Sequence, residues 1–183
     1  DVSYLSPEDV SKTVFLNGLI LEVDEGSYQA TTDSGEEIQI GSVDHELERI
    51  EGVINAGDSD LIGGGIRDKK VCLIYRYNDP EDYTETYLFY GLYDIDAERW
   101  EWSSLIPVPR EYAEGVMVLS RYGNNYFDGD GLYLCGEDTI CFLDIENNLF
   151  VPLLHVTSAV ERMMPGTTRR DEVRGFVRPT RVS

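Results

Sequence analysis

The chain has 183 residues, of which 42% are apolar and 11% aromatic, and its 15 basic and 35 acidic residues give a net charge of −20. This composition indicates a folded globular chain of one or two domains and excludes a disordered polar segment. The negative charge disfavours sequence-specific nucleic-acid binding, because phosphates repel it. No apolar run approaches the ~18 residues of a membrane-spanning helix, so no membrane span is expected.

The first half of the chain predicts short strands after a brief helix. Ser6-Pro7-Glu8-Asp9 is typical of a helix start, so a short helix is expected near residues 6–12. Two apolar runs flank Asn17-Gly18 and predict a hairpin with a type I′ turn. Further strands are expected at 27–32, 36–40 and 71–77, and a Gly- and Asp-rich loop at 57–65.

The second half of the sequence predicts more strands, then a short helix and a segment without apolar periodicity. Strands are expected at 86–95, 99–103, 115–120, 131–135, 139–145 and 150–154, with a long polar loop at 122–130. A capping box at Ser158 predicts a short helix at 158–164, after which 167–183 has no apolar periodicity and suggests an extended arm. The expected organisation is an all-β body at 1–156, followed by a short helix and basic arm at 157–183.

Two stretches of nine residues resemble each other fifty residues apart. Leu92–Trp100 and Phe142–Phe150 share an apolar strand, an Asp-Ile step, a polar turn and a large aromatic residue. The repeated positions are Asp94 with Trp100, and Asp144 with Phe150. A period near fifty is typical of stacked β-units. Residues 43–51 fit either a third, degenerate copy or a short acidic helix.

The repeated unit, followed by Ile106-Pro107-Val108-Pro109-Arg110, resembles a blade of the kelch-type β-propellers over about residues 66–154. The resemblance implies propeller-like antiparallel blades, each with its outer aromatic packed between neighbours. The paired glycines of that family are missing, and two units are fewer than the four that a closed propeller needs. The resemblance thus implies a partial propeller completed by another polypeptide segment. A β-sandwich or barrel is the alternative.

Candidate metal ligands occur in one stretch. Asp128, Asp130 and Glu137 have spacings found in calcium loops, although Tyr126 occupies the first ligand position and a simple β-turn is the favoured interpretation. The two histidines lie in no recognisable catalytic motif. We therefore expect no enzyme activity and no cofactor.

Cysteine usage bears on the compartment. The three cysteines, Cys72, Cys135 and Cys141, lie in apolar runs and are expected to be free thiols, although a Cys135–Cys141 pair is an alternative. Free thiols favour a reducing compartment or a virion over secretion.

Residues suited to contacts with other proteins lie near the end of the chain and in the loop at 122–130. Residues 161–183 carry six arginines against three acids, which leaves 1–160 with a net charge of −23. The candidate interface residues are Arg169, Arg170, Arg174, Arg178, Arg181, Tyr122 and Tyr126. The arm is expected to dock on an acidic surface, such as that of a neighbouring copy.

Three functions follow from these features. The first is a non-catalytic structural or protein-interaction subunit in a homo-oligomer or larger assembly. A specific form of it is a nozzle-like component of a virus tail with an acidic surface or lumen. The alternative from another class is a carbohydrate-binding or glycoside-active β-domain that uses Trp102 and Tyr126.

Overall fold

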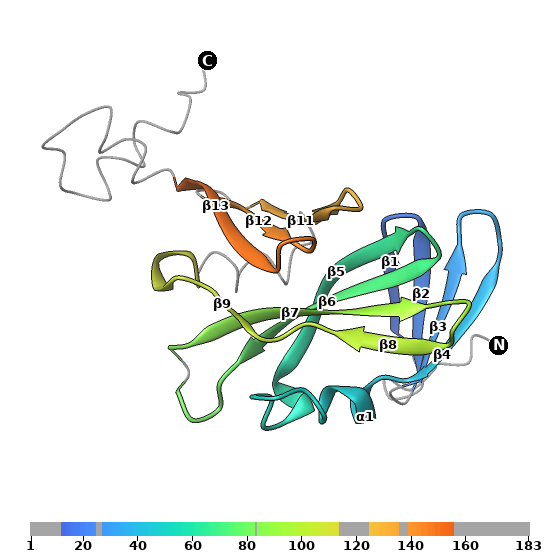
Figure 1. Ribbon diagram of the computed structural model, residues 1–183, viewed down its shortest axis with the longest axis horizontal. Helices are drawn as coiled ribbons and strands as arrows, with labels where there is room; N and C mark the ends of the chain where they lie inside the picture. Colours follow the sequence, from blue (N-terminus) through green and yellow to red (C-terminus); the bar gives the residue numbers. More distant parts are fainter. Residues whose placement is uncertain (1–11, 25–26, 83, 114–124, 136–138, 156–183) are drawn as a thin grey trace, which may run out of the picture.

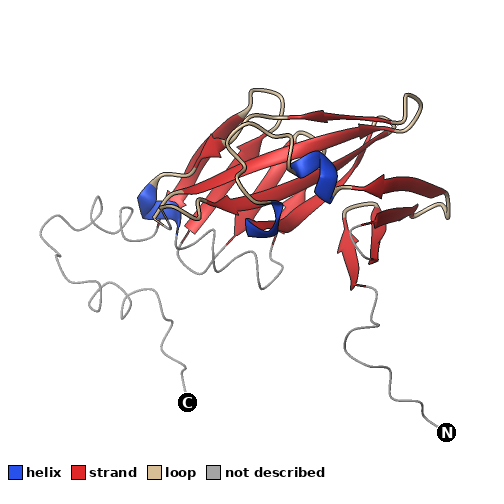
Figure 2. Ribbon diagram, turned by 90° about the horizontal axis from the view of Figure 1, so that it is seen from below, coloured by secondary structure: helices blue, strands red, loops and turns tan. Residues whose placement is uncertain are grey.

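The computed structural model of the chain describes residues 12–24, 27–82, 84–113, 125–135 and 139–155 (Figure 1). Within these residues the fold is all-β, with three antiparallel sheets that are each built on four consecutive strands (Figure 2). The predicted fold class is therefore confirmed. No helix in the described part of the chain is long and apolar enough to cross a membrane.

The strands follow one another in space as they do in the sequence. The first sheet contains β1 (Lys12–Leu16), β2 (Leu19–Asp24), β3 (Ser27–Thr32) and β4 (Glu37–Ser42). Helix α1 (Asp44–Leu47) and the 3-10 helix η1 (Ala56–Asp58) connect it to the second sheet. The second sheet contains β5 (Ser59–Arg67), β6 (Lys70–Asn78), β7 (Thr86–Asp94) and β8 (Arg99–Trp102), and β9 (Ile106–Pro107) also pairs with β7. The third sheet contains β10 (Asn125–Phe127), β11 (Gly131–Cys135), β12 (Thr139–Asp144) and β13 (Leu149–His155).

Burial along the strands shows that the second sheet lies between the other two. In β2, β4 and β12, buried residues alternate with more exposed ones, as expected for strands with one covered face. In β6, by contrast, the seven residues from Val71 to Tyr77 are all buried. A strand buried on both faces must have a layer on each side, and these layers are the first and third sheets.

Two hydrophobic clusters fill the spaces between the sheets. The first cluster joins the first sheet to one face of the second, and includes Leu19, Leu21, Ala30, Ile38, Leu73, Tyr75 and Phe89. The second joins the other face to the third sheet, and includes Ile62, Cys72, Ile74, Leu88, Leu132, Leu134, Cys141 and Leu143. Burial of these side chains stabilises the stack by about 25 cal/mol per Å² of apolar surface.

The glycine-rich loop predicted at 57–65 is wrong, because most of it forms strand β5. A Cβ atom on Gly63 would lie 2.8 Å from Cδ1 of Leu132, and one on Gly65 would collide with the ring of Phe127. These glycines therefore provide room for side chains of the third sheet, rather than flexibility.

The predicted hairpin at Asn17-Gly18 is present, but its turn is not type I′. Leu16 pairs with Leu19 across the turn. Gly18 has a positive φ of 79°, whereas Asn17 is not among the residues with positive φ. Asn17 instead forms a bridge with Gly65 of the second sheet. This contact outside the hairpin explains why Asn17 has another backbone conformation.

The fifty-residue repeat corresponds to two turns of the same geometry. The Oδ1 atom of Asp94 accepts a hydrogen bond from the Ala97 amide at 2.9 Å, and Oδ1 of Asp144 accepts one from the Asn147 amide at 2.9 Å. Glu98 and Asn148 have φ values of 50° and 55°. The aromatic residues that end the two repeats pack against different hydrophobic clusters. Trp100 packs against the cluster between the first and second sheets, and Phe150 against the cluster between the second and third.

The first sheet is a third copy of this unit, and the copy considered at 43–51 is wrong. Asp44 begins helix α1. In each sheet, the residue after the third strand donates its amide hydrogen to the last residue of the first turn. These bonds run from Asp33 to Gly18, Ile95 to Lys69 and Ile145 to Asp130, each at 3.1 Å. Asp33 precedes Ile95 by 62 residues rather than fifty, because the β6–β7 hairpin is longer than the equivalent hairpin β11–β12 of the third sheet.

Four other predictions lie partly or wholly outside the described residues. Lys12, the last residue of the helix expected at 6–12, belongs to β1, while the rest of that helix and the helix at 158–164 lie outside the described part. The loop predicted at 122–130 contains strand β10 at its centre. The strand expected at 115–120 also lies outside the described residues.

Asp144→Ala is expected to lower the melting temperature by more at about pH 7 than at about pH 2. Hydrogen bonds from the side chain and amide of Asn147 lower the pKa of Asp144 from its ordinary value of 3.8. The stabilisation is therefore present above pH 3.8 and is lost as the pH falls through the lower folded-state pKa. Thermal unfolding followed by circular dichroism measures the change, with Glu146→Ala in the same turn as control. An equal loss at both pH values would contradict this explanation.

Candidate functional site

The first strands of the three sheets meet at one place. The Asn17 amide donates to the carbonyl of Gly64, and the Asn17 carbonyl accepts from the Ile66 amide, both at 3.2 Å. The Asn17 side chain donates to the Phe127 carbonyl at 2.5 Å. Asn17 therefore connects β1 to both β5 and β10.

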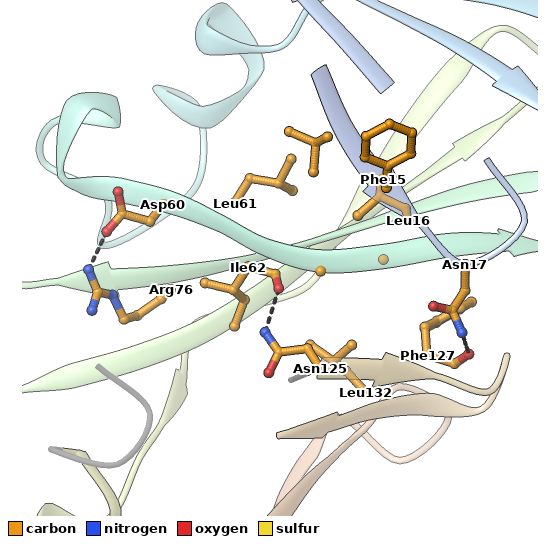
Figure 3. Close-up of a pocket in the computed structure, with 13 residues that line it drawn as sticks. Phe15, Leu16, Asn17, Asp60, Leu61, Ile62, Arg76, Asn125, Phe127 and Leu132 are labelled. Carbon is orange, nitrogen blue, oxygen red and sulfur yellow. Dashed lines mark hydrogen bonds and ion pairs between the residues drawn. The ribbon is translucent and has the colours of Figure 1, made fainter. Parts of the chain in front are cut away.

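A pocket of about 540 Å³ lies at this convergence (Figure 3). It is lined by Val14, Phe15, Leu16, Asn17, Asp60, Leu61, Ile62, Gly63, Gly64, Arg76, Asn125, Phe127 and Leu132. The side chain of Asn125 donates to the Ile62 carbonyl at 2.6 Å, which fastens β10 to β5 along the pocket wall. All three sheets thus contribute to one concave site.

One charged pair lies in the pocket. Arg76, from β6, is buried and pairs with Asp60, from β5. Figure 3 shows the two side chains pointing toward each other at one end of the lining. The Asp60 side chain is 57% exposed, so the pair presents its carboxylate to solvent while the guanidinium stays within the protein. Removing Asp60 would leave a buried cation without this partner, which is costly.

The pocket lining carries few polar side chains. Among its described residues, the polar side chains are one carboxylate, one guanidinium and two amides, and no thiol, hydroxyl or imidazole is present. Nucleophilic catalysis requires a nucleophile beside a base, and these side chains do not supply one. The lining can accept an apolar segment that carries a few hydrogen-bonding groups.

A row of apolar side chains crosses the outward side of the third sheet. Tyr126, Tyr133, Phe142 and Val151 are directly paired from β10 to β13. The ring centroids of Tyr126 and Tyr133 are 6.4 Å apart, and those of Tyr133 and Phe142 are 4.6 Å apart. Tyr126 is 58% exposed. These four residues are called the outer row below.

Trp102, expected as part of a sugar platform, packs against other rings of the protein. Its ring stacks on Trp100 with centroids 4.7 Å apart and also contacts Tyr75 and Phe89. A hollow of about 440 Å³ lies beside Trp102, between residues 49–51 and 103–105. Since the ring is engaged in this aromatic cluster, it offers less surface to a sugar than a free platform would.

Two of the candidate metal ligands have partners within the protein. Asp128 accepts hydrogen bonds from the amides of Asp130 and Gly131, as in a polar turn, and Asp130 pairs with Arg67 at 2.9 Å. Glu137 lies outside the described residues. The described residues include no group of three or more acidic, histidine or cysteine side chains that could hold a metal ion.

Of the candidate interface residues, Tyr126 alone belongs to the described part of the chain, where it begins the outer row. Tyr122 and the arginines of the arm lie outside it. The sequence prediction therefore identified the exposed member of the outer row, but not the half-buried partners of Tyr126 on the neighbouring strands.

The pocket residues were not recognised from the sequence. The sequence identifies Asn17 only as a turn former, and it places Asn125 in a loop. Arg76 offered a signal, because a lone charge within the apolar run Val71–Tyr77 indicates a buried side chain that needs a partner. Nothing in the local sequence identifies that partner as Asp60.

Cys135 is expected to be the one thiol that reacts with a thiol reagent in the folded protein. All three cysteines are free, with Cys72 and Cys141 buried and Cys135 half-buried. Burial raises the pKa of Cys141 to about 12 and also raises that of Cys72, so both remain protonated at neutral pH. Thiol counts before and after denaturation measure the difference, and Cys135→Ser should abolish the native signal. Three reactive thiols in the folded protein would contradict the burial.

The chain matches no protein-family model and none of the curated proteins with which it was compared.

Proposed function

We propose that the protein is a non-catalytic structural or protein-interaction subunit of a larger assembly, built from three propeller-like β-units. The observation that supports this most directly is the stack of three equivalent sheets. Its middle sheet is covered on both faces, whereas the outward faces of the first and third sheets expose Phe15, Ile20 and Tyr126. Large apolar side chains on such faces are typical of surfaces that bind protein.

The meeting of the first strands supports the propeller-like arrangement. In propellers, four-stranded sheets surround a central channel. Here β1, β5 and β10 contribute to one pocket, and each belongs to a sheet whose strands follow in sequence order. The three units among the described residues are fewer than the four or more of a closed propeller, which motivates the need for neighbouring protein.

The virus-tail form of this function receives less support from the pocket. An acidic lumen would allow DNA to pass without binding. The described pocket lining has one carboxylate, Asp60, and it is paired with Arg76. The net charge of −20 remains the feature that motivates this form.

The test of the proposed function is the mass of the particle that contains the protein in its own cells. The tagged chain should elute from a gentle extract well above the 20.7 kDa of the single chain. Tyr126→Asp should move it to a lower mass, whereas Ile54→Asp, which changes an exposed residue outside the three sheets, should not. Elution as a single chain in every case would contradict the proposal.

The arm can be tested in the same experiment. Deletion of residues 167–183 removes Arg169, Arg170, Arg174, Arg178 and Arg181, and we expect it to reduce the particle mass if the arm docks on an acidic neighbour. An unchanged mass would contradict the role of the arm while leaving the role of the sheets intact.

A further inference from the structure

The three sheets carry equivalent rows of paired residues on the side that faces the next sheet. In the first sheet this row is Val14, Leu21, Ala30 and Ile38; in the second it is Gly65, Cys72, Leu92 and Glu101; in the third it is the outer row. The equivalence follows from the shared bond between the third strand and the first turn. It also follows from the fifty-residue offset, which relates Leu92 to Phe142.

In the first two rows the apolar residues pack against the next sheet, whereas Glu101, at the end of the second row, is exposed. Leu21, Ala30 and Ile38 pack in the cluster that joins the first and second sheets. In the second row, Cys72 and Leu92 pack against the third sheet, and Gly65 lies against Phe127. Among the described residues, no further sheet covers the outer row, although it consists of three aromatic residues and a valine.

The opposite face of each sheet also carries equivalent residues. A pair of residues on the first two strands of each sheet faces the preceding sheet: Phe15 with Ile20, Ile66 with Val71, and Phe127 with Leu132. Val71 and Leu132 are fully buried there, whereas Phe15 is 78% and Ile20 38% exposed. Phe15 and Ile20 are called the back pair. They occupy the positions that cover a preceding row in the other two sheets.

We propose that a second copy of this chain covers the outer row, with its back pair packed on that row; this rests on the proposed function. The chain carries both halves of the repeated contact, the row and the pair, at opposite ends of its stack. Phe15 is the equivalent of Phe127, and Tyr126 is the equivalent of Gly65, so Phe15 of one copy lies nearest to Tyr126 of the other. The contact there is between two aromatic rings, whereas Phe127 packs on a glycine that has no side chain.

Two copies of the chain provide enough sheets to form a closed, propeller-like ring. Two copies joined reciprocally cover both outer rows and bring together six sheets, which lies within the ~4–8 blades of known propellers. Three copies would bring together nine and exceed that range. The reciprocal pair is therefore the arrangement expected of the purified chain.

Charge sets the conditions of the test. Each copy carries −20, so long-range repulsion opposes association at low ionic strength. At ~0.15 M salt the Debye length is ~8 Å, which screens most of this repulsion while leaving the apolar contact intact. Association should therefore strengthen as salt is added.

Sedimentation equilibrium of the purified full chain in this salt tests the proposal. The expected mass is twice the 20.7 kDa of one chain. Phe15→Asp and Tyr126→Asp should each weaken association at least ~10-fold, because each removes an aromatic anchor. Ile54→Asp should leave it unchanged, and thermal unfolding should show that every variant is folded.

A mixture of the two weakened variants separates this contact from any other. The Phe15→Asp chain keeps an intact outer row, and the Tyr126→Asp chain keeps an intact back pair, so mixing them restores one complete contact. Recovery of association in the mixture, above that of either variant alone, supports the proposal. The absence of recovery overturns it, because a contact between like faces would stay impaired.

A monomeric wild-type chain, or association that neither substitution weakens, also overturns the proposal. Failure of this proposal can be distinguished from failure of the proposed function. A chain that is monomeric when pure but part of a large particle in its cells has another protein on the outer row, so the function stands and the second copy does not. A chain that is monomeric in both conditions contradicts both.

Discussion

Gly64→Ala is expected to destabilise the protein by about 3 kcal/mol or more. Gly64 has a φ of 150° in strand β5, and a Cβ atom there would collide with the backbone carbonyl of Cys72 on the neighbouring strand. A backbone atom in a sheet cannot rotate away as a side chain can. The new methyl group must therefore separate β5 from β6 or distort both strands.

Gly35→Ala is the matched control for this prediction. Gly35 also has a positive φ, at 85°, but a Cβ atom there would have no neighbour within 4 Å. Its loss should be about 1 kcal/mol, the cost of an L-residue in this conformation. Urea unfolding of both variants measures the difference. Equal losses would show that the collision with Cys72 is absent and that β5 does not lie against β6 as described.

Ile74→Ala is expected to cost about 2–5 kcal/mol. Ile74 is fully buried in β6 and belongs to the cluster between the second and third sheets. Alanine loses the transfer free energy of the removed carbons and leaves a cavity, because the neighbouring sheet backbones cannot collapse into the space. The effect measures how firmly the third sheet packs on the second.

Ile54→Ala removes the same atoms from a side chain that is 61% exposed. Its effect should stay within about 0.5 kcal/mol. Denaturant midpoints for the two variants, with unchanged m values, give the comparison. A loss below about 1 kcal/mol for Ile74→Ala would contradict the burial of β6 on both faces.

Local pattern was sufficient to predict most of the strands. The pairs β1–β2, β3–β4 and β11–β12 follow apolar runs around turn residues, and the run from Val71 to Tyr77 predicted β6. The same reasoning failed at Gly63–Gly65. Glycine favours loops, but it also permits close approach between sheets, and only the distant residues Phe127 and Leu132 decide between these roles.

The candidate site depends on contacts that local pattern does not contain. Asn17 meets Phe127 across 110 residues of sequence, and Arg76 meets Asp60 across 16. The fifty-residue repeat identified the turns at Asp94 and Asp144 but not the first unit, because the longer β6–β7 hairpin changes the spacing between the first two units. The outer row is defined by strand pairing across the third sheet and by its equivalence to the rows of the other two sheets, neither of which local sequence contains.

The hydrogen bond from Asn17 to Phe127 has a consequence for the order of folding. Apart from the β7–β9 pair, the paired strands of each sheet are neighbours in sequence, so each sheet closes small loops at little entropic cost. The Asn17 side chain, by contrast, can reach its acceptor only after β10 has docked on β5. The turn that begins the first sheet is therefore completed by the last sheet, and its opening free energy reports whether the whole stack, rather than one sheet, has formed.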